Sequence, residues 1–230
     1  MIGVCIPAHD EAVDIPACLA SVEAAVRQVR GESVRVVVVA DACSDGTAAI
    51  ARAIGCDVVT VDVRCVGAAR AAGADYLLGL GARWLCCTDA DTRVPLHWIT
   101  GQLACGSDAV CGTVGVDDWH EHPAHVAEAF HSHYQDCDGH RHVHGANFGV
   151  SAAAYRMAGG FMPLVAHEDV RLVEALVLQQ ASIAWVRNPH VLTSARRLAR
   201  APAGFAHWLG AQYQRTDNVR LGESAVLSVG

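Results

Sequence analysis

Two aspartates, Asp89 and Asp91, lie one position apart in the run Cys86-Cys87-Thr88-Asp89-Ala90-Asp91-Thr92. The largely apolar residues 82–87 predict a short buried strand, so both carboxylates are expected at its end, where open α/β sheets bind ligands. Carboxylates at this spacing suit a hard divalent cation, because Mg²⁺ and Mn²⁺ take one or two carboxylates plus substrate phosphates. The alternative is an acidic turn that caps a helix beginning at 95–99, and the pattern alone leaves both open.

The elements that must position these carboxylates alternate between strand and helix. Runs rich in apolar and β-branched residues predict strands at 2–6, 34–40, 57–61 and 109–116. Apolar spacing, a turn signal at Asp45-Gly46-Thr47 and an Ala- and Gly-rich run predict helices at 15–29, from Thr47 onward, and at 65–80. This alternation predicts βαβ units and a mostly parallel sheet. The polar segment from 117 to His144 lacks a regular period, which is typical of a substrate pocket or mobile loop.

Composition narrows the class of protein. A chain of 230 residues that is 52% hydrophobic suits one compact α/β domain, and a formal charge of -7 argues against a nucleic-acid surface. No apolar stretch is long enough to span a bilayer and the N-terminus lacks a signal pattern, which predicts a cytoplasmic protein, either free or peripheral to the inner membrane face. The ten cysteines lie mostly in apolar runs without a C-x-x-C pair, so we expect reduced thiols.

Six ordered segments resemble the signature elements of family-two glycosyltransferases with the GT-A fold. They are Pro7-Ala8-His9-Asp10-Glu11, the run 37–47 with Asp41, Asp45 and Gly46, Gly67-Ala68-Ala69-Arg70, Thr88-Asp89-Ala90-Asp91, His144-Gly145-Ala146-Asn147 with Gly159-Gly160-Phe161, and His167-Glu168-Asp169. One departure is Ala40, where many members carry the first Asp of the second segment. The resemblance runs from residue 2 to about residue 215. It implies one GT-A domain over 1–230, with a nucleotide-sugar-binding half at 1–116 and an acceptor-binding half at 117–230.

The resemblance also implies a donor pocket. It assigns Pro7, Ala8 and Glu11, in the loop expected after the first strand, to the nucleotide. Asp41 is expected to accept a hydrogen bond from an imide N–H of the base. The alternative role for Asp41 is helix capping, for which Asp45 is the better candidate. Arg70 is expected to pair with a donor phosphate or a site carboxylate, against the alternative of an ordinary surface arginine.

The same resemblance implies roles for the acidic pairs. Asp89, Ala90 and Asp91 would face the donor diphosphate, with Asp89 and Asp91 holding Mn²⁺ or Mg²⁺ and Asp91 the more direct ligand. Asp169 is the candidate general base for the acceptor, with its neighbour Glu168 as the fallback. In isolation, two acidic residues at a helix start are equally explained by the helix dipole.

The resemblance also assigns four residues to binding of the acceptor, namely His144, Gly145, Ala146 and Asn147. Eight histidines lie between residues 120 and 144, a density that could serve a zinc site, but no His-Glu-x-x-His pattern occurs. A polar acceptor-facing loop is the favoured interpretation. We expect one histidine to complete the metal shell, with His207 the candidate and His190 a rival.

Near the C-terminus, Arg196 and Arg197 resemble a basic segment that covers the donor diphosphate in some members of the family. A solvated basic turn is the alternative. The family's Gln-x-x-Arg-Trp form is absent, which argues against a processive polysaccharide synthase and for a single-transfer enzyme.

The predicted function is therefore metal-dependent transfer of one sugar from a nucleotide-sugar donor to a hydroxyl or amine acceptor, with inversion. A UDP-sugar is the favoured donor, and GDP-mannose is the alternative donor. The acceptor is a small polar, glycan or lipid-linked molecule. A sugar nucleotidyltransferase is disfavoured because it would need a Gly-rich loop after the first strand, where this chain has Pro7-Ala8-His9-Asp10-Glu11. A haloacid-type phosphatase is disfavoured because it would need Thr or Val at position 93, where this chain has Arg. A non-catalytic nucleotide-sugar-binding module is disfavoured because Asp89, Asp91 and Asp169 are all present.

Overall fold

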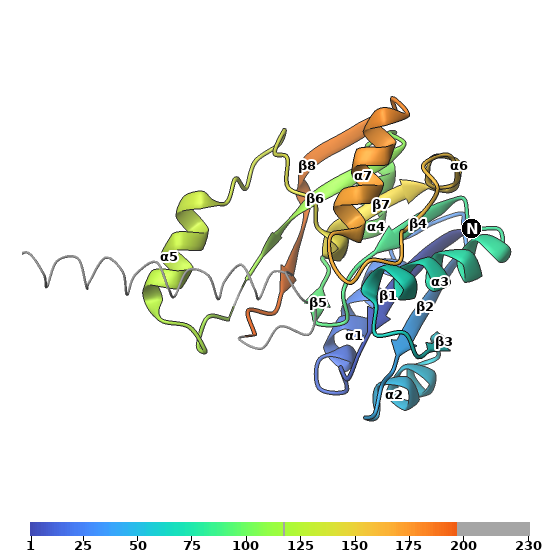
Figure 1. Ribbon diagram of the computed structural model, residues 1–230, viewed down its shortest axis with the longest axis horizontal. Helices are drawn as coiled ribbons and strands as arrows, with labels where there is room; N and C mark the ends of the chain where they lie inside the picture. Colours follow the sequence, from blue (N-terminus) through green and yellow to red (C-terminus); the bar gives the residue numbers. More distant parts are fainter. Residues whose placement is uncertain (117, 197–230) are drawn as a thin grey trace, which may run out of the picture. The chain divides into compact units, whose positions relative to one another are not determined.

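The computed structural model describes residues 1–116 and 118–196, and eight strands of this part form one mixed sheet (Figure 1). Their spatial order is β3 (Asp57–Val61), β2 (Val34–Asp41), β1 (Ile2–Ala8), β4 (Trp84–Cys87), β7 (Phe148–Ser151), β6 (Ala109–Gly115), β8 (Ile183–Thr193) and β5 (Thr92–Arg93). The first four are parallel, β7 runs antiparallel to both neighbours, β8 is parallel to β6, and β5 is antiparallel to β8. The predicted mostly parallel α/β sheet flanked by helices is confirmed.

The parallel half forms because its strands can be buried on both faces. All seven residues of β1 are buried, and β2 contributes the run Val36-Val37-Val38-Val39 beside it. β1 is longer than predicted, so Pro7 and Ala8 lie in the strand, opposite Val39 and Ala40, and not in a loop. A proline is tolerated there because the pairing with β4 ends at Cys5, so Pro7 has a partner strand on one side.

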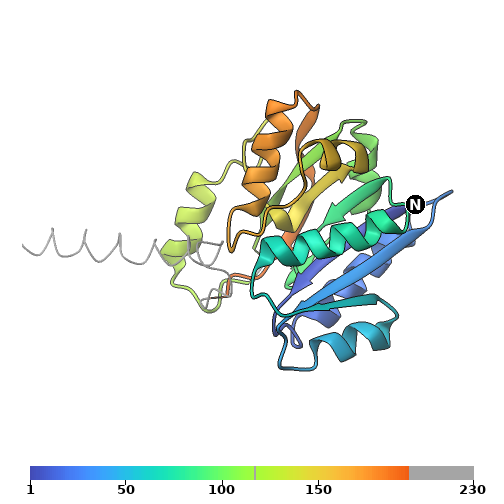
Figure 2. The same cartoon turned by 45° about the vertical axis from the view of Figure 1, so that its right-hand side comes forward.

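Helices cover the two faces of this sheet (Figure 2). On one face lie α3 (Val66–Gly79), α6 (Ala152–Met157) and α7 (Glu168–Leu178), which share a core cluster with the strands. On the other lie α1 (Ile15–Val26), α2 (Thr47–Ile54) and α4 (Trp98–Ala104). The absence of a side chain at Gly73 lets α3 approach β1 closely, since a Cβ there would lie 2.4 Å from Cys5 Sγ. Because α3 follows the carboxyl end of β3 after a short loop, its first residues lie at the carboxyl end of the parallel strands.

The chain divides into two compact units. The first contains 1–115 and 135–193, and therefore the whole sheet and the 3-10 turn η1 (Gly145–Asn147). The described part of the second holds α5 (Ala124–His133), where Val126 and Ala195 pack with Trp119 and Val116. The prediction of an irregular loop up to His144 is wrong over α5, because Val126 and Phe130, four positions apart, give that helix an apolar side. The assignment of 1–116 and 117–230 to donor and acceptor stays a prediction.

Two further observations concern the class of protein. Among the described residues, no helix is both long and apolar enough to cross a bilayer. The ten cysteines are free thiols, and five of them are buried in the sheet and its helices.

Candidate active site

The aspartate pair lies at the carboxyl end of β4. The N–H of Thr92 donates to the carbonyl of Asp89 at 3.1 Å and closes the turn, which buries Ala90 and leaves both aspartates half-buried. The Asp91 Oδ1 atom lies 3.4 Å from the hydroxyls of Thr92 and Thr193, at the junction of β5 and β8. α4 begins only at Trp98, so this pair does not cap that helix. The carboxylates thus lie at the strand end where a ligand would bind.

A buried arginine connects the first of these aspartates to the rest of the site. The side chain of Arg70, on α3, is 3% exposed. Its Nη2 donates to Asp89 Oδ1 at 2.5 Å and its Nη1 donates to the carbonyl of Gly145 at 2.8 Å. Its Nε lies 2.9 Å from Glu168 Oε1, an ion pair in which the N–H is not aligned with the oxygen. Arg70 therefore pairs with site carboxylates, and the alternative of a surface arginine is wrong.

The charges of this cluster are mutually dependent. Burial would lower the pKa of Arg70, but the carboxylates of Asp89 and Glu168 outweigh it and raise that pKa above its ordinary value. Burial also raises the pKa of Glu168, against the lowering effect of Arg70. Removing one partner would leave an uncompensated charge in the core, which typically costs about 3–5 kcal/mol. The arginine stays charged, and its position is set by two carboxylates and one carbonyl.

The second carboxylate of the acidic pair on α7, Asp169, is half-buried and contacts the same turn as Arg70. Asp169 Oδ2 accepts the N–H of Gly145 at 2.6 Å, and Oδ1 accepts the N–H of Val170 at 2.8 Å. Asp169 lies in the first turn of α7, where the helix dipole favours a carboxylate. Glu168 differs from it in that its side chain is buried against Arg70. Gly145 is thus held at its N–H by Asp169 and at its carbonyl by Arg70.

Of the predicted acceptor residues, Asn147 has a structural role. Its Nδ2 donates to the carbonyls of Thr113 and Pro189 at 2.9 and 2.7 Å, and its Oδ1 accepts the indole N–H of Trp98 at 3.0 Å. Both amide hydrogens are used inside the protein, so the assignment of this side chain to an acceptor is not supported by its contacts. Ala146 beside it is buried.

His144 is largely buried and ends a row of imidazoles. Its ring centroid lies 5.9 Å from that of His142, which in turn stacks on His140 at 5.5 Å. Burial, together with the neighbouring imidazoles, lowers the pKa of His144 to about 3. A neutral imidazole therefore lies next to Gly145. His190, the rival metal ligand, has its Nδ1 at 2.7 Å from the Thr113 hydroxyl.

At the donor end, the carboxylate of Asp41 fastens the loop that leads into α3. Oδ1 accepts the N–H groups of Val63 and Arg64 at 2.8 and 2.9 Å, and Oδ2 accepts that of Cys65 at 2.8 Å. The side chain is buried. The N-cap of α2 is Gly46, which has no side chain for the cap; Asp45, one residue earlier, accepts the N–H of Thr47 through its Oδ1 at 2.9 Å. Any bond from Asp41 to a base would be added to these three.

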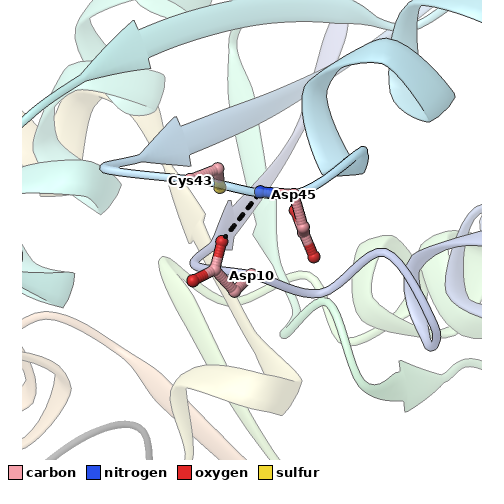
Figure 3. Close-up of side chains that lie close together, drawn as sticks. All are labelled: Asp10, Cys43 and Asp45. Atoms are coloured by element: carbon pink, nitrogen blue, oxygen red, sulfur yellow. Dashed lines mark hydrogen bonds between the residues drawn. The ribbon is translucent and has the colours of Figure 1, made fainter.

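Three side chains at the ends of β1 and β2 lie close together, as Figure 3 shows. Among the residues that the structure describes, Asp10, Cys43 and Asp45 are the one group of three potential metal ligands within 4.8 Å of one another. Asp10 accepts the N–H groups of Ser44 and Asp45 at 2.6 and 3.2 Å, the latter drawn dashed in Figure 3. The N–H of Ser44 lowers the pKa of Asp10. Backbone contacts therefore account for this cluster.

The sequence interpretation did not assign a role to Asp10. The signal that could have found it is its place in the first segment, where the family pattern has Asn and a short polar side chain can adopt the positive φ of 52° seen here. Glu11, which was assigned, is buried and its N–H donates to Thr47 Oγ1 at 2.8 Å. This bond joins the end of β1 to the start of α2.

The basic C-terminal residues are only partly described. Arg196 belongs to the second unit, where its N–H donates to Ser194 Oγ at 3.2 Å. Arg197 and His207 lie outside the described residues. Their assigned roles stay predictions.

The donor set at Asp89 and Asp91 fits a hard divalent cation. Both side chains are half-buried carboxylates, and one of them has a fixed orientation because Arg70 binds its Oδ1. A cation such as Mn²⁺ or Mg²⁺ needs only one or two such ligands when phosphate oxygens supply others.

Comparison with known proteins identifies the family and the fold of the chain. Residues 3–162 match the model of the family described as glycosyl transferase family 2. No curated protein matches the chain significantly. S. aureus TarS in complex with UDP-GlcNAc superimposes with a TM-score of 0.66 at 15% identity, over 89% of this chain and 61% of that one. The chain therefore spans about three fifths of the TarS chain.

Two further structures share the fold. The mannosyltransferase PcManGT from Pyrobaculum calidifontis, in complex with GDP-Man and Mn²⁺, gives a TM-score of 0.62 at 16% identity over 92% of this chain and 68% of that one. Glucosyl-3-phosphoglycerate synthase from Mycobacterium tuberculosis, in complex with Mn²⁺, UDP and phosphoglyceric acid, gives a TM-score of 0.53 at 18% identity. The match covers 80% of this chain and 66% of that one.

Proposed function

Because the chain belongs to glycosyl transferase family 2, we propose that it transfers one sugar from a nucleotide-sugar donor to a hydroxyl or amine acceptor. The observation that carries the proposal is the connection between Asp89 and Asp169. One arginine and one glycine join them, so the end of β4 and the start of α7 belong to the same site.

We assign the acid–base chemistry to Asp169. Its carboxylate would take the proton from the acceptor hydroxyl or amine as that group forms a bond to the anomeric carbon. The bond from that carbon to the diphosphate oxygen breaks, and its electron pair leaves with the nucleoside diphosphate. A base opposite the leaving group favours inversion. Gly145 and Val170 orient the carboxylate through their N–H groups, and each oxygen keeps a second lone pair for a substrate proton.

The donor end is assigned to the carboxylates after β4 and to the loops fastened by Asp41 and Asp10. A divalent cation held by Asp91 and Asp89 would supply Lewis-acid stabilisation of the leaving diphosphate. UDP is the favoured nucleotide, with GDP-mannose as the alternative, because the compared structures include UDP-GlcNAc, UDP and GDP-Man complexes, two of them with Mn²⁺. We further propose that the protein is cytoplasmic, either free or peripheral to the inner membrane face.

The test is isothermal titration with UDP and with GDP, each with and without Mn²⁺. We expect one nucleotide to bind in a metal-dependent way, and this binding to be lost in Asp91→Ala. The matched control is Asp75→Ala, an exposed carboxylate in the body of α3, which should bind like the unchanged protein. Absence of binding under every metal condition would contradict the proposal and favour a module that keeps only the fold.

A further inference from the structure

Glu168 occupies an unusual place next to the proposed base. Its side chain is 5% exposed and its carboxylate lies against the Nε of Arg70, whereas the adjacent Asp169 is half-buried and bonds to Gly145. A buried carboxylate with a raised pKa would have the basicity that a general base needs. Its burial against a guanidinium, however, directs it to Arg70.

We propose that Glu168 is a positioning residue that acts through Arg70, and that this pair fixes the Gly145 backbone and thereby the Asp169 carboxylate. The inference deepens the proposed function and rests on Asp169 being the base.

Four residues form a closed ring of contacts. Arg70 pairs with Glu168, Glu168 is covalently joined to Asp169, Asp169 accepts the N–H of Gly145, and Gly145 accepts from Arg70. In such a ring, no member can shift without moving or breaking a contact of the next. The base is therefore held from two directions, through its own helix and through Gly145.

Glu168 and Asp89 together hold the guanidinium of Arg70. The Glu168 carboxylate faces Nε, that of Asp89 faces the neighbouring Nη2, and Nη1 donates to the Gly145 carbonyl. If the Glu168 charge were removed, one of these two carboxylate contacts would be lost, and the guanidinium could turn about Asp89 and away from the Gly145 carbonyl. Gly145 would then lose a charge-assisted hydrogen bond, and its N–H would orient Asp169 less well. Small misplacements of this kind reduce turnover by about 100-fold.

The first test follows the Gly145 amide by hydrogen exchange in the whole protein, which requires no substrate. In Glu168→Gln we expect this amide to exchange at least about 10-fold faster, since its position is less restrained. The amide of Val4, in the buried strand β1, reports global opening and should change much less. The control Glu174→Gln, which removes the exposed partner of Arg171 on the same helix, should change neither. An unchanged Gly145 amide in Glu168→Gln would overturn the proposal.

The second test is a double-mutant cycle on the release of UDP from UDP-GlcNAc. Glu168→Gln should lower kcat by about 10- to 100-fold while the Kd for UDP with Mn²⁺ changes by less than about 3-fold. In an Arg70→Gln background the same change should lower kcat by less than about 3-fold, because its route of action is already gone. Equal losses in both backgrounds would identify Glu168 as a base acting on its own and refute the positioning role.

Arg70→Gln removes a buried charge and can unfold the protein, so Arg70→Lys provides a second background. A lysine keeps the charge but has no planar fork to reach three partners at once. The loss caused by Glu168→Gln should again shrink in this background. If the unchanged protein binds no nucleotide and releases no UDP, the proposed function fails, but the Gly145 exchange still decides whether Glu168 restrains that residue.

Discussion

A single added methyl group at Gly145 should disable the site. An ideal Cβ there would lie 2.3 Å from Arg70 Nη2 and 2.5 Å from Cζ, where ordinary van der Waals contacts begin at 3.4 Å. The guanidinium must therefore retreat by about 1 Å, but it is buried and held by Asp89 and Glu168. Relief by a rotamer change would break the bond to the Gly145 carbonyl.

The magnitude follows from two terms. Overpacking of a buried site costs about 1–3 kcal/mol. Loss of a hydrogen bond from a charged donor costs about 1.5–3 kcal/mol. We expect Gly145→Ala to lower the free energy of unfolding by about 3–5 kcal/mol, and the Tm by roughly 10 °C in a chain of this size. Turnover should fall by about 100-fold, because Asp169 loses its fixed partner.

The assay is thermal unfolding with UDP release measured on the same preparations. Gly79→Ala is the matched control, since a Cβ at the last residue of α3 meets nothing within 4 Å. It should be neutral or raise the free energy of unfolding by up to about 1 kcal/mol. If Gly145→Ala unfolds at the same temperature as Gly79→Ala and keeps its turnover, the close contact with Arg70 does not constrain the site, and the reasoning is refuted.

Two further changes probe other parts of the same unit. Asp41→Asn should lower the free energy of unfolding by about 2–4 kcal/mol, because an amide has one oxygen for three backbone N–H groups and its NH₂ would face at least one of them; an unchanged urea midpoint would contradict this. His144→Asn should flatten the dependence of stability on pH. The pKa of His144 falls from 6.5 when unfolded to about 3 when folded, so within that window the unfolded chain binds the extra proton and stability decreases as pH falls. Urea unfolding at pH 7 and pH 5 measures the slope, and an equal slope in the variant would exclude His144 as its source.

The parallel part of the fold could be predicted because its signals are local. Dense β-branched runs predicted β2 and β3 nearly to the residue, since β-branched side chains favour strands, both in β2, whose second half is buried, and in the partly buried edge strand β3. β1 was predicted too short at Pro7, because a proline usually ends a strand and the missing neighbour beyond Cys5 is a property of the sheet. α5 was missed because its histidines concealed a short apolar spacing.

The site could be predicted as a set of residues but not as a set of contacts. The motifs assign Asp41 and Asn147 to ligands, which stays a prediction, and the contacts that the structure adds are to backbone groups inside the protein. Short polar side chains bind backbone N–H and carbonyl groups as readily as they bind ligands. Which of the two occurs depends on the loops that tertiary packing brings near, and those loops are distant in sequence.

For Arg70, the local sequence predicts burial of the side chain but does not identify its partners. Arg70 lies three positions from Gly67 and three from Gly73, so the three residues share one side of α3. Both glycines mark close approach, since a Cβ would lie 2.1 Å from the Met162 carbonyl at one and 2.4 Å from Cys5 Sγ at the other. An arginine on such a side must be buried, and a buried arginine needs carboxylate partners. That reasoning predicts an ion pair from the helix alone, but the choice of Asp89 and Glu168, which come from two other segments, requires the assembled sheet.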